Sequence, residues 1–99
     1  MVFNNVLLRA KDPQWVTEIS ELLRQQAYLS SVELGCERFD AYQPEADPGL
    51  FLLIKVWASQ GHLAQHRKAE AFTQMYQLKV LPLVHREPDL CRRIWPSPH

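Results

Sequence analysis

The chain has 99 residues, of which 46% are hydrophobic and 22% charged, and its 11 basic and 11 acidic side chains cancel to a formal net charge of zero. This length suits one domain, the composition excludes a wholly disordered chain, and the balanced charge provides no basic face for nucleic acid or an anionic membrane. No N-terminal signal segment and no apolar run of about 20 residues is visible, so we expect a cytoplasmic protein.

The first quarter of the chain is predicted to be a strand followed by a helix. Residues 2–10 are rich in strand-forming side chains. Asp12 then suits an N-cap and Pro13 the first helical position, where no N–H is needed. Apolar side chains recur at helical spacing behind them, which predicts a helix over residues 13–30.

A hairpin is predicted next. Gly35 lies in the connector, where a positive φ is easily tolerated. The apolar period changes to two over residues 36–43, and a loop of turn-forming residues, 44–49, leads into a strand over 50–58. This strand is apolar on both faces, so both faces need cover.

The last third is predicted to be helical and then extended. Ser59 can cap a helix that begins one residue later, with a break near Arg67 and an end before Pro82. We expect residues 83–88 to be irregular, because they end in a proline that lacks a ladder donor. The last strand is therefore predicted over residues 89–95.

The predicted order β-α-β-β-α-β defines an α+β, ferredoxin-like split β-α-β fold, with a four-stranded antiparallel sheet and both helices on one face. The domain is expected to span residues 1–96, with 97–99 as a disordered tail. The uncovered sheet face should pack against a second copy, which predicts a homodimer. Cys36 and Cys91 should lie at opposite sheet edges, too far apart for a disulfide.

Several residues have the spacing of a known family. Glu33-Leu34-Gly35-Cys36, then the strand that ends at Trp57, then Leu63 and His66 resemble the antibiotic biosynthesis monooxygenase (ABM) family of dimeric α+β barrels. Its usual pattern is G-C, an aromatic-rich strand ending E-x-W, and L-x-x-H. Lys55 departs from this pattern, because the family commonly has an acidic residue two positions before the tryptophan.

The resemblance implies a cofactor-independent monooxygenase that acts on an aromatic polyketide, a quinol or a similar small phenol. His66 would be the base, because an imidazole can take up a proton near neutral pH. Trp57, Phe72 and Tyr76 would hold the substrate ring, with Asn5 or Tyr76 donating a hydrogen bond. No metal-ligand set or dinucleotide fingerprint is visible, so no cofactor is expected.

Two other functions stay open. Arg38-Phe39-Asp40 together with His66 also resembles the quorum-signal isomerase branch, in which Lys55 or Arg38 would bind a phosphorylated substrate. A non-catalytic dimeric binding module is the other alternative. The haem-degrading branch is disfavoured: Asn5 matches its early asparagine, but the chain lacks that branch's tryptophan at position 66 and its haem-ligating histidine near Tyr76.

Overall fold

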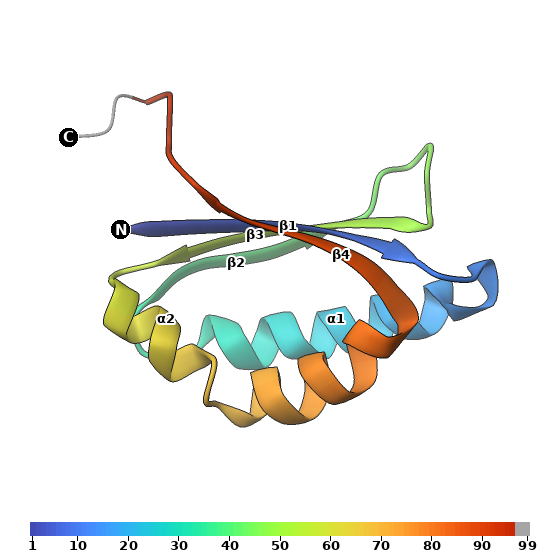
Figure 1. The fold of residues 1–99 in the computed structure, drawn as a ribbon, viewed down its shortest axis with the longest axis horizontal. Coiled ribbons are helices and arrows are strands. Elements are labelled where there is room, and N and C mark those ends of the chain that lie inside the picture. Colours follow the sequence, from blue (N-terminus) through green and yellow to red (C-terminus); the bar gives the residue numbers. More distant parts are fainter. Residues whose placement is uncertain (97–99) are drawn as a thin grey trace.

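The computed structural model describes residues 1–96, apart from the side chains of Pro88 and Asp89. Its elements are β1 (Val2–Ala10), the 3-10 helix η1 (Pro13–Trp15), α1 (Val16–Ser31), β2 (Cys36–Tyr42), β3 (Leu50–Trp57), α2 (Gln60–His66), the π-helix η2 (Ala71–Val80), the 3-10 helix η3 (Leu81–Leu83) and β4 (Val84–Cys91). The strands form one antiparallel sheet in the order β2-β3-β1-β4. All helical segments lie on one face of this sheet (Figure 1). The predicted ferredoxin-like fold is confirmed, and the predicted tail, 97–99, lies outside the described residues.

The predicted N-cap begins the first helical segment, η1 followed by α1. The Asp12 side chain accepts a hydrogen bond from the backbone N–H of Gln14 at 3.0 Å, and Pro13 occupies the first helical position. One 3-10 turn leads directly into α1, which ends one residue beyond the predicted boundary. The buried stripe of α1 consists of Ile19, Leu23, Gln26 and Ser30.

The second helical segment is interrupted, as predicted, directly after α2. The chain continues as the π-helix η2, which the sequence did not predict. Its buried residues are Ala71, Tyr76 and Val80, and their wide spacing reflects a π-helix, which closes its hydrogen bonds over five residues.

The last strand corrects the prediction. We expected irregular backbone over 83–88 and a strand over 89–95, but β4 spans Val84–Cys91 and pairs with β1 along its whole length. Pro88 is tolerated inside it because β4 is an edge strand, where a residue without an N–H can sit on the unpaired side. Cys36 and Cys91 lie on the two opposite edge strands, as expected.

The core lies between the sheet and the helices. Alternate residues of β3 point into it, and these are Phe51, Leu53, Lys55 and Trp57. The other four residues of β3 lie half-buried on the uncovered sheet face; they are Leu50, Leu52, Ile54 and Val56. The apolar character on both sides of this strand is therefore real, and only one side is covered within the chain. Among residues 1–96, no helix is long and apolar enough to cross a membrane.

Candidate functional site

His66 occupies the last turn of α2 and points into the core. Its ring lies against the Trp57 ring, with 4.4 Å between centroids and 30° between planes. The rings of Phe39 and Phe72 meet it edge-on at 6.0 Å and 5.3 Å. The residue is only 3% exposed. Ser59 sets the direction of this helix by accepting the His62 backbone N–H at 3.2 Å, so the predicted cap helps to place His66.

Glu33 orients the imidazole, a role that the sequence analysis did not assign to it. Its Oε1 lies 2.7 Å from His66 Nδ1. A carboxylate only accepts hydrogen bonds, so Nδ1 donates and Nε2 keeps its lone pair. In the described part of the chain, this buried Nε2 has no hydrogen-bond partner. Burial lowers the pKa of His66 below its ordinary value of 6.5, and Glu33 offsets this only in part. The ring is therefore neutral at about pH 7 and can act as a base.

Gly35 follows the turn that carries Glu33 and packs against the start of the helix that carries His66. It has a φ of +83°, as predicted from the sequence, and its carbonyl accepts the Ala58 N–H at 2.8 Å. A Cβ at Gly35 would collide with the His62 ring. His62 is half-buried against this glycine, and its Nδ1 lies 2.8 Å from Ser59 Oγ.

Lys55 lies inside the same site. The residue is 2% exposed, and its Nζ is 5.7 Å from the ring centroids of both Phe39 and Tyr76. Burial, together with smaller contributions from the positive charges of Arg86 and Arg67, lowers its pKa from 10.5 to about 8. Lys55 is therefore a buried ammonium group, not a charge at the rim of the sheet.

Tyr76 and Phe72, both on the π-helix, complete the arrangement. Tyr76 is fully buried, and its hydroxyl accepts a hydrogen bond from Arg86 Nε at 3.1 Å. Burial raises the pKa of this phenol. The Phe72 ring lies 5.4 Å from that of Tyr76 and also touches His66. Each of these side chains thus contacts the next, and the last contacts the first. Together with Trp57 we call them the His66 cluster, which consists of His66, Phe39, Lys55, Tyr76, Phe72 and Trp57.

Asn5 and Arg38 lie outside the His66 cluster. Asn5 alternates with the buried Asn4 and Val6, so it lies on the uncovered face of the sheet. Asn4 is 5% exposed and is paired with Lys55 in the strand register. The sequence analysis had instead named Asn5 as the hydrogen-bond donor. Asn4 shares its sheet face with the buried Val6 and Leu8, so the period of two along β1 was the signal that could have identified it.

Arg38 is held at the exposed edge of the sheet. Its Nε bonds the carboxylate of Asp40, and its Nη2 lies 3.4 Å from the hydroxyl of Tyr42. Side chains alternate along β2, so Arg38 and the buried Phe39 point to opposite faces. The structure therefore does not bring Arg38 together with Lys55 or His66.

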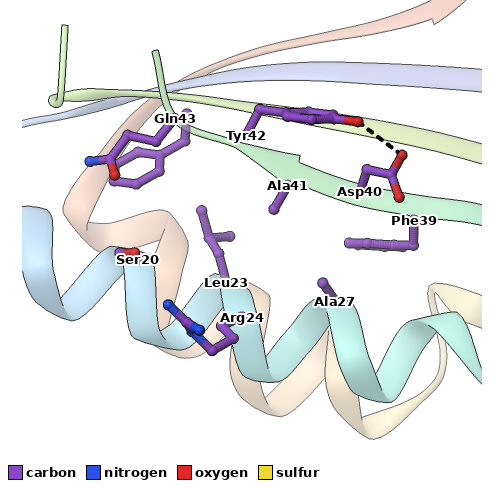
Figure 2. A pocket seen from close by; sticks show the side chains of 10 residues that line it. Ser20, Leu23, Arg24, Ala27, Phe39, Asp40, Ala41, Tyr42 and Gln43 are labelled. Carbon is purple, nitrogen blue, oxygen red and sulfur yellow. Dashed lines mark hydrogen bonds between the residues drawn. The ribbon is translucent and has the colours of Figure 1, made fainter. Parts of the chain in front are cut away.

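An open groove borders the cluster on one side. It has a volume of about 500 Å³ and runs between β2 and α1. Figure 2 shows Phe39, Leu23 and Ala27 between strand and helix, while Tyr42 and Asp40 lie on the other side of β2. Phe39 lines both this groove and the cluster, but His66 and Trp57 do not line the groove. The His66 cluster itself is closed, with Trp57 and Tyr76 fully buried.

No metal site is apparent in the described part of the chain, since no three His, Cys, Asp or Glu side chains there gather as ligands. What the cluster offers is a base of defined tautomer, a buried cation and flat apolar walls. These groups can take a proton from a small aromatic molecule and hold the resulting anion.

The fold and this interior define a small ferredoxin-like α+β domain with a buried His–Glu pair among aromatic rings. Residues 1–78 match the antibiotic biosynthesis monooxygenase family, to which the chain therefore belongs. No curated protein is significantly similar in sequence.

Several solved structures share the fold. A Pseudomonas aeruginosa protein superposes with a TM-score of 0.82 and 22% identity, over 94% of each chain. An antibiotic biosynthesis monooxygenase gives 0.81 and 20%, over 93% of this chain and 98% of that one. A Mycobacterium tuberculosis protein gives 0.82 and 18%, over 95% and 96%. At these identities the likeness concerns the fold alone.

Proposed function

We propose that this protein is a cofactor-independent monooxygenase that acts on a small electron-rich phenol, such as an aromatic polyketide or a quinol. Membership of the antibiotic biosynthesis monooxygenase family supports this. The observation that carries it is the state of His66, whose Nδ1 is held by Glu33 while its buried Nε2 has no partner among the described residues. A neutral imidazole held in one tautomer is what a general base requires.

In the proposed reaction, His66 Nε2 removes the phenolic proton, and Glu33 stabilises the imidazolium that forms. The electron-rich phenolate then reduces dioxygen. One oxygen atom becomes bonded to a substrate carbon, and the other leaves as water with two hydrogens from the substrate. The rings of Trp57, Phe72 and Tyr76 hold the substrate, and the buried site keeps bulk water from the intermediate.

Access to the closed cluster is proposed to run past Phe72. Among the rings of the cluster, Phe72 is the one that stays partly exposed, while Trp57, Phe39 and Tyr76 are buried. Phe72 also lies on the π-helix, directly after the break in the second helical segment. π-Helical turns are frequent at functional sites, which supports this position for the route of access.

We also infer a homodimer formed through the uncovered sheet face. The alternate residues of β3 that point away from the helices are apolar and half-buried, and Leu7 of β1 is 38% exposed on the same face. A second copy of this face would cover both surfaces at once. This pairing corresponds to the dimeric barrel that the family resemblance implied.

The direct test is oxygen uptake with a quinol or an anthrone-type phenol as substrate. His66→Gln should reduce turnover by about 10²- to 10⁴-fold, the usual contribution of a general base. Gln65→Ala is the control, because Gln65 is an exposed residue of the same helix, α2, directly before His66. Turnover by His66→Gln at the rate of the native protein would eliminate His66 as the base.

A non-catalytic binding module is the second candidate, and one observation favours it. The His66 cluster is filled by its own side chains, with Trp57 and Tyr76 fully buried. Binding of a phenol without any oxygen uptake, in native protein and in His66→Gln alike, would support this reading.

The isomerase alternative keeps Lys55 as a phosphate ligand but loses Arg38, which is engaged with Asp40.

A further inference from the structure

Lys55 is a buried charge whose neighbours are aromatic rings. It is 2% exposed, its Nζ lies near the rings of Phe39 and Tyr76, and no ion pair with a carboxylate is found for it in the part of the chain that the structure describes. Buried charges in proteins are normally paired, because removing an ion from water is costly. The strand register sets Asn4 and Phe39 opposite it on the two neighbouring strands, and neither supplies a negative charge.

The surrounding charges make the ammonium group less stable. Arg86 and Arg67 both act on Lys55 as like charges. Glu33, the carboxylate of the site, is engaged with His66 Nδ1. The rings of Phe39 and Tyr76 offer cation–π contacts, which compensate part of the desolvation but provide no acceptor for the three N–H donors. The site therefore has an excess of positive charge that a bound anion would neutralise.

We propose that Lys55 is the charge-recognition residue of the His66 cluster, and that the ligand of this cluster is a small aromatic molecule with its negative charge on oxygen. The proposal deepens the proposed function, since it names the ionic state of the molecule that the same site holds. Lys55 Nζ donates to the phenolate or carboxylate oxygen as a charge-assisted hydrogen bond. The aromatic body packs against the rings of the cluster after entering past Phe72.

The walls favour an aromatic anion over a phosphate. The Nζ lies 5.7 Å from the ring centroids of both Phe39 and Tyr76, so the walls nearest to the charge are aromatic. Arg86 already donates to the Tyr76 hydroxyl, and Arg67 is an exposed residue at the end of α2. A phosphate would need several donors around one anion, whereas a phenolate or carboxylate can be held by one.

The test is equilibrium binding by calorimetry, without turnover, to three probes: 1-naphthoate, its uncharged isostere 1-naphthamide, and inorganic phosphate. The native protein should bind naphthoate about tenfold or more tightly than naphthamide, as expected for one charge-assisted hydrogen bond in a buried site. Lys55→Met should lose this preference and bind the two alike. Lys68→Met, which removes an exposed lysine, should match the native protein.

Three results would overturn the proposal: equal binding of naphthoate by Lys55→Met and native protein, no naphthoate binding by the native protein, or binding of phosphate in preference to naphthoate. Lys55→Arg keeps the charge and should retain part of the preference, which separates loss of charge from loss of fold. His66→Gln should still bind naphthoate. Naphthoate binding that depends on Lys55, with no oxygen uptake from any phenol, would leave this proposal standing and remove the monooxygenase.

Discussion

Replacing Lys55 with methionine is expected to stabilise the protein near neutral pH. Burial lowers the pKa of Lys55 from 10.5 to about 8, which corresponds to about 3 kcal/mol at about 1.36 kcal/mol per pKa unit. That free energy is the cost of keeping the Lys55 amine protonated in the folded protein. Methionine has a similar length and packs well against rings such as Phe39 and Tyr76. Loss of the two cation–π contacts offsets about 0.5–2 kcal/mol, so a net gain of about 1–3 kcal/mol is expected.

The contribution of Lys55 to stability changes with pH in the opposite direction to that of a lysine in a surface ion pair. A group whose pKa is lower in the folded state contributes stability above its unfolded pKa and loses it as the pH falls. The contribution of Lys55 therefore rises between about pH 8 and 10.5. The advantage of Lys55→Met should be largest at about pH 7 and shrink as the pH approaches 10.

Urea unfolding of both proteins across this range measures the effect. Tyr76 and Cys36 also titrate there, and burial raises both of their pKa values, so their contributions run the other way. The Cys36 contribution cancels in the difference between variant and native protein, whereas Tyr76 contacts Lys55, so the comparison is also made in a Tyr76→Phe background. Lys68→Met controls for a simple change of net charge. A variant less stable than the native protein at about pH 7, or an advantage that does not change with pH, would refute the reasoning.

Three further predictions concern the same fold. Trp57→Ala should cost about 3–5 kcal/mol in chemical denaturation, because Trp57 is fully buried, and an unchanged midpoint would contradict this. The His66 ring should titrate below 6.5 by NMR, and Glu33→Gln should lower its pKa further, because Glu33 raises it; a midpoint at or above 6.5 in the native protein would be incompatible with the burial argument. Stability linked to His66 is then present above pH 6.5 and lost as the pH falls through the folded-state pKa. Ile54→Glu should yield monomers in sedimentation experiments where the native chain is a dimer, since Ile54 lies on the uncovered face; a native monomer at micromolar concentration would remove the dimer.

The sequence by itself was enough for features that depend on neighbours along the chain. The β1 boundaries, the Asp12 cap, the positive φ of Gly35, the Ser59 cap and the break after α2 were all predicted. Each rests on local preferences of one residue and the next few. The order of elements then restricts the topology to a few choices, which is why the ferredoxin-like fold and the family could be predicted.

Other features were decided by packing between distant segments. Glu33 is 33 residues from His66, and nothing near either residue indicates that they meet. Lys55 is an ordinary charge in a strand until Phe39 and the π-helix close over it. The strand β4 runs through Pro88 because it lies at a sheet edge, a position that only the assembled sheet defines. Local preferences thus set the elements of this protein, whereas the protonation, burial and partners of its site residues depend on long-range contacts that exist only once the sheet and helices have packed.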